Sequence, residues 1–409
     1  MNSIEGNTLP KGWVKRKLGE VFKDISSGFA CSKRFEKDGG YVHLRTHNIS
    51  TQGVLNFDKI IQIEESKVNR KSSKIYKGDV IFNNTNSTEL VGKTSFVDKD
   101  YNYGFSNHLT RIKTSDFSQG KYLTYFLTHL HQQGHFFRIC KKWIGQSGVN
   151  ISMLKDLNYY YPPLEEQKRI VAKIDTLFAK IDKAISLTEE SLVQAKNLLP
   201  SVLKEVFEKG KADGWEEKKL GDIAFLKSGS TPSRSNNSYW DEGTIPWLKS
   251  GELNDVMGIK ENSEFITEIA LNETSVKLFE KDTLLIAMYG ATAGKLGILS
   301  INATTNQAVC SIQNKKGMFN NHFMFYFLFS IREQIIGDSF GGAQPNISKT
   351  YLETLTLRLP DLSIQEVAVS LCNELSLKAK QTQSKLEEQL AYLKQLKSSI
   401  LSKAFKGEL

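Results

Sequence analysis

The sequence predicts an α+β fold in which two similar mixed α/β domains are separated by an antiparallel pair of long coiled-coil helices, with pseudo-twofold symmetry between the halves. Two observations lead to this prediction. A series of short motifs occurs twice along the 409 residues, and a repeat of this kind indicates a duplicated structural unit. Each series is followed by a stretch in which apolar residues recur at coiled-coil spacing.

The two series keep a nearly constant separation of about 200 residues. Gly12-Trp13 opens the first series and Gly214-Trp215 opens the second. Later pairs in this register are Gly92-Lys93 with Gly294-Lys295, Tyr125-Phe126-Leu127 with Tyr326-Phe327-Leu328, Asn150-Ile151-Ser152 with Asn346-Ile347-Ser348, and Ser201-Val202-Leu203 with Ser399-Ile400-Leu401. Because chance rarely preserves one shift over so many matches, we interpret the chain as two copies of one unit.

Each copy consists of a mixed domain followed by a helix. We expect the mixed domains at 1–163 and 211–361, and the spacer helices at 164–210 and 362–409. In the mixed domains, short apolar runs such as 80–82 and 284–287 are separated by Gly, Asn, Ser and Thr clusters, which is typical of strands and loops. The apolar run at 323–329 is too short to span a bilayer and is predicted to be a buried helix.

Both helical stretches carry an apolar or small residue at steps of mainly four and three, including Ile174, Leu177, Ile181, Ala184 and Thr188 in the first and Leu371, Leu375, Ala379, Thr382 and Leu386 in the second. Since such a seam is unstable in water, we expect the helices to pack together as a rod of roughly 50 Å. The stretches begin after Pro163 and Pro360. Pro200 should kink or end the first. The alternative is that these are ordinary bundle helices, or that they bind a different protein.

The charge and the cysteines indicate the kind of partner and the compartment. The formal charge is +9 and the pI is near 9.1, which favours a polyanion, with nucleic acid the natural candidate. The four cysteines are far apart and form no zinc-ligand spacing, which is typical of a reducing compartment. We therefore expect a cytoplasmic protein with no membrane association.

Two similar basic domains held at a fixed separation suggest that the polyanion is duplex DNA, whose half-sites are usually read by two copies of a protein. Side chains with paired donors and acceptors read bases, whereas Lys, Arg and hydroxyl groups contact phosphates. The candidates in the first copy are Lys33, Arg34, Arg45, Asn83, Asn84, Thr85, Lys93, Asn107, His108, Lys141, Lys142, Gln146 and Ser147. Those in the second copy are Ser230, Thr231, Ser233, Arg234, Lys249, Tyr289, Thr292, Lys295, Asn306, Gln307 and Gln344.

No motif for catalysis or metal binding is complete, so we expect no catalytic residue and no metal site. The segment 290–295 resembles a phosphate loop, but it is one residue short and Leu296 stands where Ser or Thr should bind magnesium. Its glycines are predicted to serve a tight turn. The Pro162-Pro163 pair lacks the flanking residues of an amino-methyltransferase motif, and the two histidine pairs at i,i+4 spacing lack a third ligand.

Over essentially its full length, the chain resembles the specificity subunit of type I restriction-modification systems. The resemblance rests on the duplicated opening motifs, on Ile245-Pro246-Trp247 with the 290–295 segment and Asn306-Gln307, on the closing segments from Asn150 and Asn346, and on the C-terminal 404–409. The first copy lacks an Ile-Pro-Trp motif, and the 41–44 segment is expected to take its place.

The resemblance implies that each mixed domain is a target recognition domain that reads one half of an interrupted asymmetric sequence, while the paired helices set the spacer. The helices would also dock two modification subunits, which bind S-adenosylmethionine and methylate adenine. Restriction subunits that use ATP and magnesium would join through that core. The chain itself would hold no cofactor. An adaptor with two protein-binding modules on a coiled coil is the main alternative, and a fused enzyme subunit with an undetected active site is a third.

Overall fold

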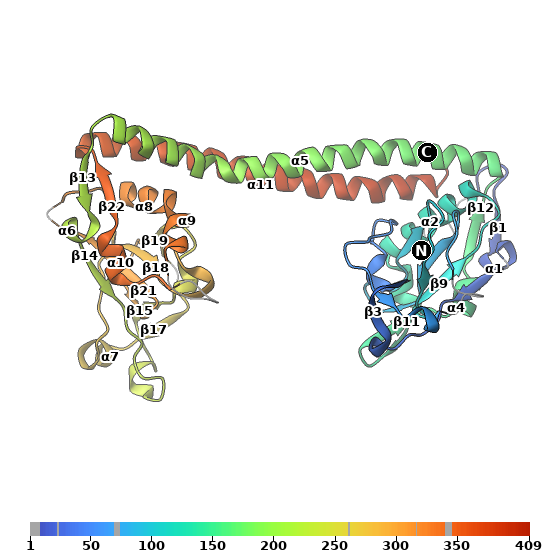
Figure 1. Cartoon of the computed structure of the whole chain (residues 1–409), viewed down its shortest axis with the longest axis horizontal. Helices are drawn as coiled ribbons and strands as arrows, with labels where there is room; N and C mark the ends of the chain where they lie inside the picture. Colours follow the sequence, from blue (N-terminus) through green and yellow to red (C-terminus); the bar gives the residue numbers. More distant parts are fainter. Residues whose placement is uncertain (1–8, 23, 69–73, 261, 316, 340–345) are drawn as a thin grey trace. The chain divides into compact units, whose positions relative to one another are not determined.

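A computed structural model describes residues 9–22, 24–68, 74–260, 262–315, 317–339 and 346–409 (Figure 1). The chain divides into two compact units, one formed by Met1–Thr188 with Glu388–Leu409 and the other by Glu189–Glu387. The two longest helices, α5 (Leu164–Ala212) and α11 (Leu362–Ala404), each contribute to both units. Each unit therefore consists of one mixed domain with half of each long helix.

The first mixed domain is built on an antiparallel four-stranded sheet in the order β2-β9-β5-β7. Its strands are β2 (Ile25–Ser27), β5 (Val80–Asn83), β7 (Thr94–Phe96) and β9 (Leu109–Ile112). A second sheet has the order β4-β3-β8, with β3 (Glu36–Leu44), β4 (Gln62–Ile63) and β8 (Gly104–Phe105). The apolar run at 80–82 thus forms a central strand, as predicted, and all of its side chains are buried.

Two smaller sheets and several short helices complete this domain. The strands β1 (Val14–Lys17) and β12 (Asn158–Tyr161) pair with each other, and β6 (Thr85–Asn86), β10 (Lys141–Trp143) and β11 (Gln146–Gly148) form the sheet β10-β11-β6. The α-helices are α1 (Leu18–Val21), α2 (Phe117–Gln132), α3 (His135–Ile139) and α4 (Ile151–Lys155). Short 3-10 helices lie at Lys33–Phe35, Thr46–Asn48 and Glu65–Lys67.

The second mixed domain has a five-stranded sheet in the order β14-β21-β18-β19-β16 and a three-stranded sheet in the order β17-β15-β20. The strands are β13 (Glu216–Lys219), β14 (Ala224–Ser228), β15 (Ile245–Leu248), β16 (Val256–Ile259), β17 (Glu264–Ile266), β18 (Leu284–Ala287), β19 (Leu296–Leu299), β20 (Thr304–Thr305), β21 (Val309–Asn314) and β22 (Thr356–Leu359). The α-helices are α6 (Leu220–Ile223), α7 (Glu268–Glu273), α8 (Asn321–Ser330), α9 (Arg332–Gly337) and α10 (Lys349–Thr354). Short 3-10 helices lie at Asn237–Tyr239, Ser250–Glu252 and Gly290–Thr292.

The topology of the two domains confirms the duplication. The order β2-β9-β5-β7 corresponds to β14-β21-β18-β19, and the pair β1-β12 corresponds to β13-β22. In each domain a strand runs parallel to a short partner: His43 pairs with Gly104 between β3 and β8, and Trp247 pairs with Thr304 between β15 and β20. This register confirms that the 41–44 segment takes the place of the Ile-Pro-Trp motif.

In both units the halves of α5 and α11 lie antiparallel, which confirms the predicted helix pair. In the first unit, Lys397 of α11 donates to Asp182 of α5, and the Arg169 guanidinium reaches the backbone oxygen of Leu409 at 2.8 Å. In the second unit, the Gln383 amide lies 3.3 Å from the carbonyl oxygen of Ala195. The pseudo-twofold relation between the units stays a prediction.

Helix α5 does not end at Pro200 but continues to Ala212. A proline inside a helix removes one backbone hydrogen bond and frees a carbonyl group. Pro200 is exposed, so water can satisfy that carbonyl, whereas Leu203 in the next turn is fully buried in the core of the second unit. Burial of the residues beyond Pro200 therefore offsets the proline penalty.

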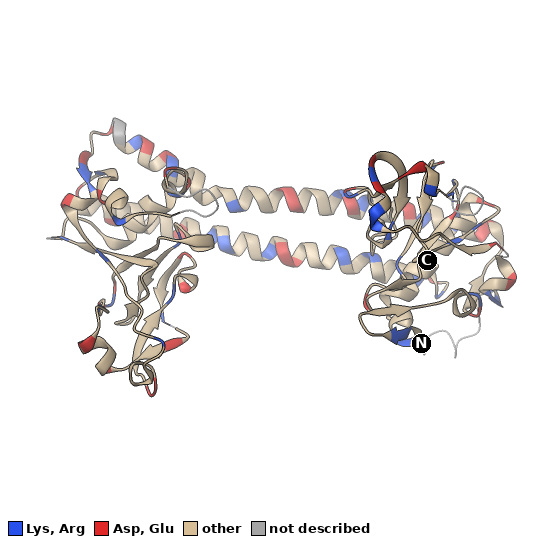
Figure 2. Cartoon of the chain, turned by 60° about the horizontal axis from the view of Figure 1, so that its bottom comes forward, with Lys and Arg blue, Asp and Glu red and all other residues tan. Residues whose placement is uncertain are grey.

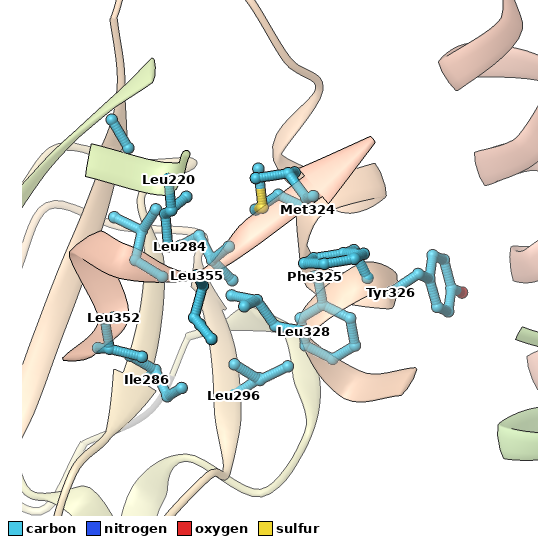
Figure 3. Packing of buried hydrophobic residues seen from close by; sticks show 14 of the residues in the cluster. Leu220, Leu284, Ile286, Leu296, Met324, Phe325, Tyr326, Leu328, Leu352 and Leu355 are labelled. Carbon is cyan, nitrogen blue, oxygen red and sulfur yellow. The ribbon is translucent and has the colours of Figure 1, made fainter. Parts of the chain in front are cut away.

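The core of the second unit lies between its large sheet and helices α8 and α10 (Figure 3). Leu284, Ile286 and Leu296 from the sheet meet Phe325 and Leu328 from α8. The apolar run at 323–329 is thus a buried helix, as predicted. None of the helices in the described part of the chain combines the length and the apolar character that crossing a bilayer requires.

The C-terminal end of α11 completes the core of the first unit. Phe405 is 2% exposed, and its ring centroid lies 5.4 Å from those of both Tyr122 and Phe126 in α2. We expect Phe405→Ala to lower the free energy of unfolding of the first unit by about 3–5 kcal/mol, since a buried aromatic ring is replaced by a cavity.

Hydrogen exchange followed by mass spectrometry measures this effect locally. Protection should fall in α2 and stay unchanged in α8, which belongs to the other unit. Tyr392→Ala is the matched control, because Tyr392 lies on the same half of α11 and is 62% exposed. Equal loss of protection in α2 and α8, or an equal effect of the control, would contradict the prediction.

Candidate nucleic-acid interface

In the first domain, the turns that follow several strands meet at one end of the sheets. The backbone N–H of Phe29, after β2, donates to the carbonyl of Phe105 at the end of β8 (3.1 Å), and the N–H of Ser106 donates to Leu44 at the end of β3 (3.0 Å). The N–H of Asn84, after β5, donates to His108 (3.0 Å). The loops that carry the first-copy candidates therefore converge, at the end of the domain away from α5 and α11 (Figure 1).

The second domain brings its corresponding turns together in the same way. The N–H of Ser230, after β14, donates to Thr305 (2.9 Å), and the N–H of Asn306 donates to Leu248 at the end of β15 (2.9 Å). Met288, at the end of β18, donates to Ala308 (2.7 Å). The repeated strand order thus gives both domains a loop surface of the same construction.

Many first-copy candidates present their side chains to solvent. The exposed ones are Lys33, Arg34, Asn107, Lys141, Lys142 and Gln146, and the half-buried ones are Arg45, Thr85 and His108. The Arg45 guanidinium donates to the carbonyl of Cys31 (3.2 Å), which fixes it beside the loop that carries Lys33 and Arg34.

Four candidates in the first copy are buried and bonded internally. The Asn84 amide donates to the Thr110 hydroxyl (2.8 Å), the Lys93 ammonium donates to the carbonyls of Thr46 and Ile49 (3.0 and 2.5 Å), and the Ser147 hydroxyl shares a hydrogen bond with Thr88 (2.8 Å). Asn83 is fully buried in β5. Burial lowers the pKa of Lys93.

These contacts revise the role of Asn83, Asn84, Lys93 and Ser147. The side chains of Asn84, Lys93 and Ser147 bond backbone and hydroxyl partners within the domain, as buried polar groups generally do, and the Asn83 amide lies 3.4 Å from the carbonyl oxygen of Leu90. They hold the loops in place and do not belong to the exposed surface of the domain.

The sheet β10-β11-β6 carries four of the accessible first-copy candidates, namely Thr85, Lys141, Lys142 and Gln146. Lys142 pairs with Ser147, and Thr85 of β6 pairs with Gly148. The turn of this hairpin holds Trp143 and Ile144, which the sequence analysis missed. The available signal was a pair of large apolar residues between two lysines and a Gly-Gln turn.

In the second domain, Arg234 and Lys249 are held by partners that sequence reasoning also missed. The Arg234 guanidinium lies 3.7 Å from the centroid of the Trp240 ring and pairs with Glu264 (2.5 Å). Lys249 pairs with the other oxygen of Glu264 (2.7 Å). Hydrogen bonds from Lys249 and Arg234 hold the pKa of Glu264 below its usual value. Both cations are therefore fixed in place and partly neutralised.

The other second-copy candidates differ in accessibility. Thr231, Ser233, Tyr289 and Gln307 are exposed, and Ser230, Thr292 and Asn306 are half-buried. The Thr231 hydroxyl donates to the side-chain oxygen of Gln307. Lys295 pairs with Asp255 (2.9 Å), which also binds Arg332. Gln344 lies outside the described residues.

The segment that resembles a phosphate loop is a tight turn, as predicted. Gly290 and Gly294 have φ values of 70° and 79°, in the left-handed region that favours glycine. The N–H of Gly294 donates back to Ala287 (2.8 Å), which closes the turn between β18 and β19. Among the described residues, no group of three or more His, Cys, Asp and Glu side chains is arranged to hold a metal ion.

Charge alone does not outline the surface. Lys and Arg are interspersed with Asp and Glu along both mixed domains and both long helices (Figure 2). The candidate contact surface is therefore identified by the convergence of the loops and by their neutral hydrogen-bonding side chains, and less by a basic patch.

Comparison with known proteins gives one consistent family. The family model for the type I restriction modification DNA specificity domain matches residues 10–190 and again 212–392. The chain is 26% identical over 380 residues to the putative type I restriction enzyme MjaX specificity subunit of Methanocaldococcus jannaschii, covering 88% of this chain and 85% of that protein. It is 23% identical to the type I restriction enzyme StySPI specificity subunit of Salmonella potsdam, covering 98% and 90%.

Solved structures share the fold. The chain superposes with a TM-score of 0.78 at 21% identity on a structure described as "Structural basis underlying complex assembly and conformational transition of the type I R-M system", covering 98% of this chain and all of the other. The HsdS subunit from Thermoanaerobacter tengcongensis matches with a TM-score of 0.61 at 20% identity, covering 99% of each chain. Since the family model covers most of both copies, the chain belongs to the type I restriction-modification DNA specificity subunits, with two target recognition domains.

Proposed function

We propose that each target recognition domain reads one half of a bipartite, asymmetric DNA sequence, and that this subunit carries out no catalysis itself. The observation that supports this is the repeated loop surface. The two domains have the same strand order, and each brings different side chains to the equivalent end of its sheets. A repeated scaffold holds its loops in the same orientation, so a change of side chains changes the bases that are read.

The exposed residues at the two loop surfaces fit this role. Asn107 and Gln146 in the first domain and Gln307 in the second carry amides, which can donate and accept hydrogen bonds at once, as adenine recognition in the major groove requires. Lys33, Arg34 and Lys141 supply positive charge for phosphates. Because the two sets differ, the two halves of the target should differ as well.

The catalytic steps would belong to partner subunits. Two modification subunits would bind S-adenosylmethionine and methylate adenine, and restriction subunits would use ATP and magnesium to move along and cut the DNA. The whole assembly would work in the cytoplasm. An adaptor with two protein-binding modules is a weaker reading, because the family model for a DNA specificity domain matches both copies of the repeat.

An apolar groove on the second unit is a candidate docking site for a modification subunit. It is lined by α5 and α11, with Val202 and Val206 on one side and Ile364, Val367 and Leu371 on the other. Val367 and Leu371 are 62% and 63% exposed. A strip of this kind is stable only when it is covered, and contiguous exposed apolar residues mark interaction sites.

The same positions in the first unit have a different chemistry. In the repeat register that pairs Gln167 with Gln365, the counterparts of Ile364, Val367 and Leu371 are Glu166, Arg169 and Lys173. Glu166 and Arg169 form an ion pair (2.7 Å), and Arg169 also donates to Leu409. The two docking positions are therefore unequal, and the apolar one should contribute more to affinity.

The main test is selection from random bipartite duplexes in the presence of the modification subunit. Asn107→Ala should relax the preference in one half only, and Gln307→Ala in the other half only, by about ten- to a hundredfold at a single position. Gln334→Ala is the matched control, because Gln334 is an exposed glutamine of the second domain beside Phe207 of α5, on the helix side. If no sequence is selected, or if each variant alters both halves, the proposal fails.

A second test asks whether the length of the helix pair sets the length of the DNA spacer between the two half-sites. Four residues added after Ser186 in α5 and four after Leu393 in α11 should lengthen the pair by about 6 Å. We expect the selected spacer to grow by one to two base pairs, since base pairs rise about 3.4 Å. Matching insertions keep the pairing of Asp182 with Lys397 and of Ala195 with Gln383 on either side. If the half-sites stay the same and the spacer length does not change, the helix pair does not set the spacer.

The groove on the second unit is tested by a matched pair of substitutions. Leu371→Asp should weaken binding of the modification subunit by about tenfold or more, because a carboxylate would replace an apolar contact. Leu377→Asp is the control, since Leu377 is 58% exposed on the same helix but does not line the groove. Analytical ultracentrifugation of the mixture gives the affinities. Similar losses in both variants would show that general disruption of α11 is responsible.

A further inference from the structure

The β10–β11 hairpin of the first domain ends in an exposed apolar tip. Trp143 pairs with Gln146 across the turn, and Ile144-Gly145 forms the two residues between them, with Gly145 at φ 77°. Trp143 is 60% exposed and Ile144 is fully exposed. Two large apolar side chains at the end of a protruding hairpin are poorly accommodated in water, so the tip is suited to contact with a ligand.

The Trp143 ring is held by the hairpin itself. A Cβ atom at Gly148 would lie 2.8 Å from Cζ3 and 3.1 Å from Cη2 of the ring, so the ring rests on the backbone of the opposite strand where only glycine leaves room. One side of the indole is therefore supported and the rest is open to solvent. A fixed aromatic ring loses little conformational entropy when it stacks on another flat group.

Cations flank the apolar tip. Lys141 and Lys142 precede Trp143 on β10 and are exposed, and Lys142 lies 4.9 Å from the centroid of the exposed Phe137 ring. An apolar tip with lysines beside it is complementary to duplex nucleic acid, in which flat apolar bases lie between two rows of phosphates.

The tip belongs to the same surface as the candidate base-reading loops. The N–H of Val149, directly after β11, donates to Asn84 (2.9 Å), and the N–H of Asn84 donates to His108 (3.0 Å). When the loops that carry Asn107 and Gln146 approach DNA, the hairpin tip must approach it too.

Resting on the proposed function, we infer that Trp143 and Ile144 form a wedge that inserts at one base step of the half-site read by the first domain. Ile144 enters between neighbouring base pairs, and the Trp143 ring stacks on the base or sugar exposed there. Insertion of an apolar side chain partly unstacks the step and bends the duplex. This half-site would then be selected in part by how easily that step deforms, at positions that make no hydrogen bond to the protein.

The inference is tested with the complete subunit, the modification subunit and a duplex chosen by the selection described above. 2-Aminopurine is placed in turn at each position of the half-site read by the first domain, except at the adenine that the modification subunit extrudes, because extrusion raises its fluorescence independently. We expect fluorescence to rise on binding at one step for the unaltered protein. Ile144→Ser should abolish this rise and weaken binding roughly tenfold or more.

Further variants separate the wedge from its alternatives. Trp143→Ala should also lower the fluorescence rise, and Trp143→Phe should restore part of it. Val54→Ser is the matched control, since Val54 is 61% exposed in the same domain but lines a groove shared with α5. A mismatch at the unstacked step should rescue binding by Ile144→Ser, because the step is then already weakened.

The outcomes distinguish failure of the wedge from failure of the proposed function. If the unaltered complex selects a bipartite site but no probe changes its fluorescence, or Ile144→Ser leaves the change intact, the wedge is wrong while the proposed function stands. If Ile144→Ser weakens binding of the modification subunit without DNA, the tip is a protein contact and the inference is overturned. If no bipartite sequence is selected at all, the proposed function itself fails.

Discussion

The structure depends on the burial of side chains from the two long helices, and from the residue that follows α11, in the cores of both units. Phe405, near the C-terminus, packs on α2 of the first unit, and Leu203 with Phe207 packs in the core of the second unit. The core of the first unit therefore includes residues that follow the whole second domain in the sequence. The helices are thus part of both folded units as well as a link between the two copies.

This arrangement leaves the opposite end of each domain free for recognition. The sheets are anchored on the helix side, where Tyr125 and Lys121 of α2 both bond Asp175 of α5. The loops at the far end are fixed by backbone hydrogen bonds between strand ends and by buried groups such as the Lys93 ammonium. Side chains on these loops can change without disturbing the core, so one scaffold can hold two unlike reading surfaces.

The sequence predicts those parts of the structure in which residues or motifs recur at a regular spacing. The repeat, the helix seam and the buried helix at 323–329 all follow from the spacing of residues. The repeat also predicts that His43 of the first copy is equivalent to Trp247 of the second. Spacing does not reveal which way a loop side chain points, so Lys93 resembled a DNA contact although it binds two carbonyls inside the domain. Trp143 and Glu264 were missed because their importance depends on Gly148 and Arg234, which only the fold brings beside them.

Divergence between the copies affects both ends of each unit. On the helix side, the strip at Ile364, Val367 and Leu371 is apolar in the second unit, whereas the first unit has Glu166, Arg169 and Lys173 there. At the loop end, Arg234 of the second domain lies on the rings of Trp240 and Trp247, whereas the first domain has His43 at the position of Trp247. The two copies therefore share a scaffold but present different side chains at both surfaces, as the proposed reading of an asymmetric site by a single chain requires.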